Sequence, residues 1–61
     1  MNLYRDPKYL KEAVDEAMEL LKTNTMDIVM LTMLDRHYLN KFEYRTLLNA
    51  IWDERLRRSR S

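Results

Sequence analysis

TMDIVMLTMLDRHYL, residues 25–39, lies at the centre of a chain of 61 residues that contains no glycine and a single proline. Seven of the nine residues from Met26 to Leu34 are apolar, and three of the seven are methionine. Ile28, Val29 and Thr32 are β-branched, as is common in strands. A lone strand would have nothing to pair with in so short a chain, so we expect a helix here. The lack of glycine also disfavours the tight turns of β-hairpins. The sequence therefore predicts an all-α fold.

The central helix has two apolar faces when its residues are placed at intervals of about 100°. One face holds Ile28, Leu31, Leu34, Tyr38 and Leu39, and the other holds Met26, Met30, Met33 and His37. A surface helix normally shows one apolar stripe, so two faces require two packing partners. These are either the other helices of the same chain or a second polypeptide. If the partner is a second polypeptide, the face with Met26, Met30, Met33 and His37 is a candidate surface for partner binding or self-association. Methionine suits such a surface because it adapts to irregular shapes.

Capping signals and apolar periodicity divide the rest of the chain. Three helices are expected, over about residues 7–22, 26–39 and 41–58, with 59–61 as a frayed tail. Asp6 can cap the first helix, and Pro7 suits its first position. Asn24 or Thr25 can cap the second helix.

The third helix has its own start signal, because Asn40 and Glu43 have the spacing of a capping box. An alternative remains, since a repeat with gaps of four and three runs from Met26 to Ile51, and residues 26–58 contain neither proline nor glycine. These residues could form one continuous helix. The chain would then be a two-helix hairpin that pairs with a second copy as a four-helix bundle. Both versions are a single all-α domain spanning residues 1–61.

Charge is distributed unevenly along the chain, whose formal net charge is +1. Residues 41–61 hold six basic and three acidic side chains, a net charge of +3. Four arginines lie among the last seven positions: Arg55, Arg57, Arg58 and Arg60. They are candidates for binding nucleic acid, or they complement the C-terminus of the third helix. The low overall charge and the lack of a recognisable docking motif weigh against nucleic acid.

A second candidate surface runs along the third helix. Arg45, Asn49, Trp52 and Leu56 follow one another at spacings of four, three and four. Tryptophan and arginine are enriched at binding hot spots, so this line is a candidate for contact with a partner. The alternative is that Trp52 anchors the core of the chain itself.

The sequence offers little for catalysis or cofactor binding. Cysteine is absent, which excludes disulfides and thiolate metal sites. His37 is the only histidine, Asp35 cannot face it from two positions away, and no nucleophile lies nearby in the sequence. The methionines and His37 could bind Cu(I), but packing explains the same residues more simply. We expect no catalytic residues, no metal and no cofactor.

These observations predict a small non-enzymatic regulatory or adaptor protein that binds another protein through a helical surface, as a homodimer. The alternative is a DNA- or RNA-binding accessory protein that uses the four C-terminal arginines. No apolar run approaches the ~20 residues of a membrane span, and the N-terminus lacks the pattern of a secretory signal. A cytoplasmic location and no membrane partner are therefore expected.

Overall fold

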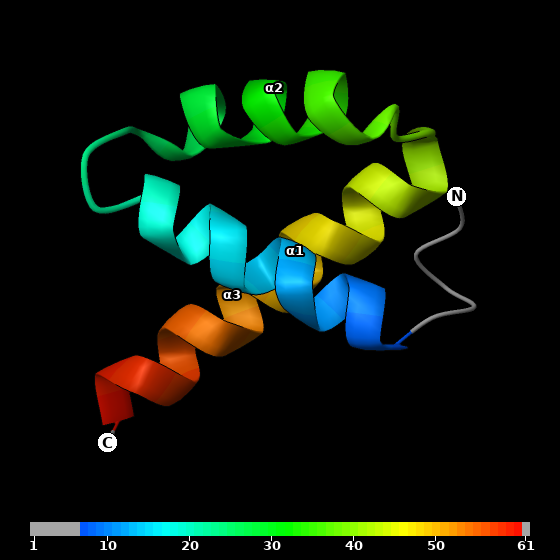
Figure 1. Cartoon of the computed structure of the whole chain (residues 1–61). Helices are drawn as coiled ribbons and strands as arrows, with labels where there is room; N and C mark the ends of the chain where they lie inside the picture. The colour runs from blue at the N-terminus through cyan, green and yellow to red at the C-terminus, as the bar shows by residue number, and fades with distance from the viewer. Residues whose placement is uncertain (1–6, 61) are drawn as a thin grey trace.

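The computed structural model describes residues 7–60, which form three α-helices and no strand (Figure 1). The helices are α1 (Pro7–Leu20), α2 (Met26–His37) and α3 (Lys41–Arg60). The predicted all-α fold is confirmed in its three-helix form. The predicted cap at Asp6 lies outside the described residues.

In the connection between α1 and α2, Asn24 ends the first helix and Thr25 caps the second. The backbone N–H groups of Thr23 and Asn24 both donate to the carbonyl of Leu20, at 3.2 and 2.9 Å, so the last turn of α1 tightens and the helix ends two residues earlier than expected. The Asn24 side chain donates to the same carbonyl at 3.0 Å. The hydroxyl of Thr25 accepts a long bond of 3.5 Å from the N–H of Ile28. Asn24 thus closes α1, and Thr25 is the N-cap of α2.

The connection between α2 and α3 separates the two helices by two capping motifs. Tyr38 ends α2 in the left-handed conformation, with φ 52° and ψ 50°, and its N–H donates to the carbonyl of Leu34. The N–H of Glu43 donates to Oδ1 of Asn40 at 2.8 Å, and the N–H of Asn40 donates to Oε1 of Glu43 at 3.1 Å. The predicted capping box is confirmed. It starts a new helix, so the repeat that crosses this point does not form one continuous helix.

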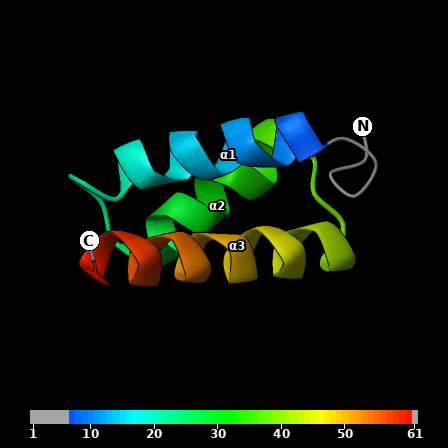
Figure 2. The ribbon, with the colours of Figure 1, turned by 90° about the horizontal axis from the view of Figure 1, so that it is seen from below.

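The three helices are arranged around one core. α1 and α3 run in the same general direction and cross, and α2 runs back along one side of this pair (Figures 1 and 2). The buried side chains come from all three helices: Ala13, Val14, Ala17, Val29, Met30, Met33, Leu47 and Ile51. The small residues of α1 allow the other helices to approach it closely, and the methionines of α2 fill the space between α1 and α3.

α3 continues beyond this core. Ile51 is its last buried residue, and every residue from Arg55 to Arg60 is exposed. The helix nevertheless includes residues 59 and 60, which were expected to fray, whereas Ser61 lies outside the described residues.

Candidate functional site

The two apolar faces of α2 have opposite surroundings. Met30 and Met33 are 2% and 0% exposed, and Met26 packs partly buried against the core. Ile28 and Leu31, in contrast, are 51% and 65% exposed. The methionine face was the candidate docking surface, but α1 and α3 both pack against it, so Met30 and Met33 offer no surface to a partner. The unpartnered apolar face of α2 is the other one.

His37 belongs to a cluster that joins α2 to α1, which we call the His37 cluster: Tyr9, Glu16, Arg36 and His37. The Tyr9 hydroxyl is hydrogen-bonded to Nδ1 of His37 at 2.6 Å, and the two rings meet edge to face. Nε2 is buried without a hydrogen bond among the described residues, 3.4 Å from Oε1 of Glu16. Glu16 also pairs with Arg36. Both ring nitrogens therefore face α1, and His37 holds two helices together instead of facing a partner.

This cluster could not be predicted from the sequence. Tyr9 and Glu16 belong to a different helix from His37, and the only acid considered beside His37 was Asp35, which is exposed. A local pattern cannot reveal a contact that only the packing of two helices creates.

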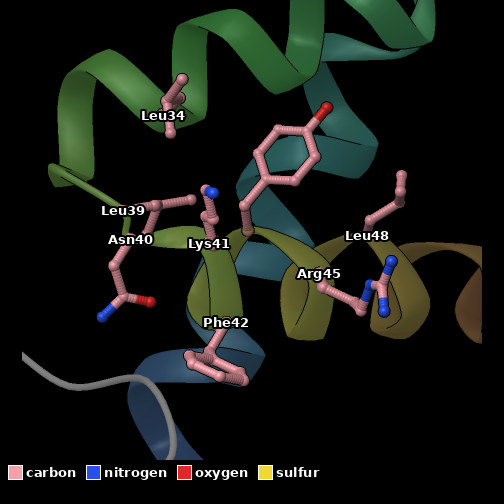
Figure 3. Close-up of a pocket in the computed structure, with 8 residues that line it drawn as sticks. Leu34, Leu39, Asn40, Lys41, Phe42, Arg45 and Leu48 are labelled. Atoms are coloured by element: carbon pink, nitrogen blue, oxygen red, sulfur yellow. The ribbon is translucent and has the colours of Figure 1, made fainter.

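An apolar groove with a volume of about 670 Å³ opens between α2 and α3 (Figure 3). We call it the α2–α3 groove, and its lining residues are Leu34, Leu39, Asn40, Lys41, Phe42, Tyr44, Arg45 and Leu48. Leu34 projects from α2 and Leu48 from α3, whereas Phe42 points away from Leu34. The volume falls within the range of pockets that accept small ligands or the side chains of a docked peptide.

The capping motifs between the helices explain why the groove exists. α2 and α3 meet at the connection around Tyr38 and diverge from it (Figure 1). Their fully buried side chains pack into the core shared with α1, which leaves Leu34 and Leu48 half-buried on the flanks. None of the described helices covers these two leucines from the open side. The groove is thus a consequence of where α2 ends and α3 begins.

Two exposed aromatic residues flank the connection between α2 and α3. Tyr38 is 90% exposed and Phe42 is 74% exposed. Tyr38 also has a left-handed backbone, which disfavours any residue with a Cβ by roughly 1–2 kcal/mol. Exposed aromatic rings are typical of protein interfaces. Tyr38 is exposed and has an unfavourable backbone conformation, so it is a candidate for contact with another molecule.

The predicted line along α3 lies at the surface and adjoins the groove. Arg45, Asn49, Trp52 and Leu56 are all exposed, and Arg45 also lines the groove. The guanidinium of Arg55 lies 4.7 Å from the centre of the Trp52 ring, in a cation–π contact. Trp52 is therefore not a core anchor, because almost half of it is accessible.

The C-terminal arginines are exposed, and three of the four are engaged within the chain. Arg57 pairs with Glu54 at 3.4 Å, and Arg58 pairs with Glu54 at 2.9 Å and with Asp15 at 3.8 Å. Arg57 and Arg58 therefore share the carboxylate of Glu54. The hydrogen bond from Arg58 holds the pKa of Glu54 below its ordinary value.

Among residues 7–60, no group of three or more His, Cys, Asp or Glu side chains is placed to hold a metal ion. No helix in the same range combines the length and the apolar character needed to cross a membrane.

Comparison of the chain with known protein families, with curated proteins and with solved structures finds no match. The function must therefore be argued from the geometry of the chain itself. The α2–α3 groove, with the exposed line along α3, is the surface that this geometry distinguishes.

Proposed function

We propose that this chain is a non-enzymatic protein-binding module, of the regulatory or adaptor kind, whose docking surface is the α2–α3 groove. One observation carries the proposal: Leu34, Leu39 and Leu48 line an open groove that the described helices of the chain leave uncovered. Burial of such apolar surface is favourable by about 25 cal/mol per Å². A partner that fills the groove gains this energy, and the chain gains stability with it.

The exposed line along α3 extends the same surface. Arg45 belongs to both, and Trp52 follows two helical turns further on. A partly exposed tryptophan that a cation already orients is a suitable hot spot, because little of its freedom remains to be lost on binding. The groove would supply the apolar anchor sites and Trp52 an additional contact.

Self-association remains a second way to cover the groove. A two-fold dimer places the same surface of both copies in contact. Lys41 and Arg45 both line the groove, so two grooves facing each other would bring cations together. A partner of a different kind avoids this repulsion and is therefore the better-supported occupant.

Binding of DNA or RNA by the C-terminal arginines receives less support from the geometry. Arg57 and Arg58 share Glu54, and Arg55 lies over Trp52. Phosphate contacts would have to compete with these interactions. The arginines also lie on the part of α3 that extends beyond the core, away from the groove.

The proposal is tested by affinity capture with three baits, followed by measurement of binding constants. The baits are the wild-type chain, a groove variant with Leu34→Gln and Leu48→Gln, and a control variant with Ile28→Gln and Leu31→Gln. The control also replaces two large aliphatic side chains by glutamine, but at exposed positions of α2 outside the groove. Circular dichroism first establishes that all three chains are folded.

We expect a nuclease-treated lysate to yield a protein that wild type and control retain and that the groove variant loses. By isothermal titration calorimetry, its dissociation constant should rise at least ~30-fold for the groove variant and about tenfold or more for Trp52→Ala, as for hot-spot residues elsewhere. Equal retention by all three baits, or loss from the control alone, contradicts the proposed surface. Nuclease-sensitive capture that depends on the four arginines favours the nucleic-acid alternative.

A further inference from the structure

We infer that the partner presents an acidic amphipathic helix to the α2–α3 groove, with apolar side chains in the groove and carboxylates on Lys41 and Arg45. This inference rests on the proposed function, because it names the chemistry of the molecule that the groove would hold. It follows from the distribution of charge around the groove.

The groove has basic residues and no acidic ones along its lining. Of the eight lining residues, only Lys41 and Arg45 carry charge, and both are exposed. Neither forms an ion pair with a carboxylate among residues 7–60. Charged groups across an interface are normally complementary, so two cations beside apolar walls favour carboxylates on the partner.

Three acids among residues 7–60 are engaged elsewhere in the fold. The carboxylate of Glu43 is buried in the capping box. Glu16 pairs with Arg36 and lies beside His37, and Glu54 pairs with two arginines near the end of α3. The basic rim is therefore available to an incoming carboxylate. Arginine suits this contact because its planar group can bind both oxygens of a carboxylate.

The shape of the groove favours a helix as the incoming element. Its walls are the side chains of two diverging helices, Leu34 on one side and Leu48 on the other (Figure 3). A helix laid in such a groove presents apolar anchors at positions i, i+3 or i+4, and i+7, with polar side chains along its edges. An extended strand would instead need a sheet edge, and residues 7–60 contain no strand.

The test is a selection of peptides against the full chain. A phage-displayed library of random 16-residue peptides is selected on the immobilised wild-type protein, and the most enriched sequences are synthesised with a fluorescein label. Fluorescence anisotropy then measures their affinity for four chains: wild type, Lys41→Glu with Arg45→Glu, Leu34→Gln with Leu48→Gln, and Lys11→Glu with Arg60→Glu. The last variant changes the net charge by the same amount at exposed positions outside the groove.

We expect the selected peptides to be acidic, with apolar residues at helical spacing. Their affinity should fall at least tenfold for the first two double variants and less than threefold for the last. Peptides in which the acids are replaced by lysine should recover tenfold or more on the Lys41→Glu, Arg45→Glu chain. This recovery distinguishes a charge contact from a loss of folding.

The possible failures separate the inference from the proposed function. Neutral or basic peptides that still depend on Leu34 and Leu48 overturn the acidic partner and leave the groove as a docking surface. Acidic peptides that are unaffected by the Leu34→Gln, Leu48→Gln change overturn both. A selection that enriches nothing, together with dimerisation of the chain through the groove in sedimentation experiments, replaces the acidic helix by a second copy of the protein.

Discussion

At the scale of single residues, Tyr38 combines two unfavourable features. It is almost fully exposed, and it is the only residue among 7–60 with a positive φ. Glycine or asparagine usually occupies this position at the end of a helix. Strain of this kind often marks a residue that is needed for contact and not for folding.

Replacement of Tyr38 by glycine should stabilise the chain by about 1 kcal/mol, because glycine adopts the left-handed conformation without a steric penalty. Tyr38→Ala is the matched control, since it removes the same ring and retains a Cβ. Urea denaturation followed by circular dichroism measures both. If glycine is no more stable than alanine at this position, the left-handed backbone is not the source of strain.

Glu54 provides a prediction about pH at the same scale. The hydrogen bond from Arg58, with the nearby charges of Arg57 and Arg58, lowers its pKa from 4.5. A carboxylate whose pKa is lower in the folded chain contributes stability above its unfolded pKa, and the contribution disappears as the pH falls through the folded value. NMR titration of the carboxyl carbon should therefore find Glu54 titrating below its ordinary pKa. Arg58→Ala should raise that pKa, whereas Arg60→Ala should leave it in place; an unshifted pKa in the wild type would contradict the ion pair.

At the scale of elements, the starts of α2 and α3 were predictable because their capping signals are local. Thr25 caps an N–H three residues further on, and Asn40 and Glu43 are also three residues apart, so spacing alone identifies these caps. The predicted C-terminal ends were less accurate, since α1 ends at Leu20 and α3 continues to Arg60. These ends depend on hydrogen bonds in the turn after α1 and on ion pairs along α3, and helix propensity does not describe either.

The N-cap of α3 should be worth about 1 kcal/mol, so Asn40→Ala should lower the free energy of unfolding by about that amount. Asn40→Asp keeps an acceptor for the N–H of Glu43 and serves as the conservative control. Chemical denaturation gives both values. An alanine variant as stable as wild type would mean that the capping box does not define the start of α3.

At the scale of the whole molecule, the candidate site was only partly predictable. Arg45, Asn49, Trp52 and Leu56 formed a candidate contact line, and all four are exposed, which rules out the alternative of a core role for Trp52. The sequence left open whether the methionine face of α2 meets the other helices or a partner, and the structure packs that face against α1 and α3. Methionine and isoleucine are both apolar, so their spacing along the helix does not show which face is buried. The groove itself could not be predicted, since it depends on the angle between two helices.

A matched pair of substitutions tests which face of α2 packs in the core. Met33→Ala should destabilise the chain by about 2–5 kcal/mol, because it leaves a cavity among fully buried side chains. Leu31→Ala removes an apolar side chain of similar size from an exposed position and should change stability by less than ~0.5 kcal/mol. Thermal and urea unfolding measure both changes. If Leu31→Ala lowers the free energy of unfolding more than Met33→Ala does, the face with Leu31 packs in the core, contrary to the structure.

Docking of a partner in the α2–α3 groove can be observed residue by residue by NMR shift mapping. The chain is labelled with ¹⁵N and ¹³C and titrated with the captured protein or with a selected peptide. We expect the methyl signals of Leu34, Leu39 and Leu48 and the indole N–H of Trp52 to shift together with the bound fraction, while the methyl signals of Ile28 stay in place. Shifts centred on Ile28 and Leu31, or confined to the arginines from Arg55 to Arg60, would contradict docking in the groove.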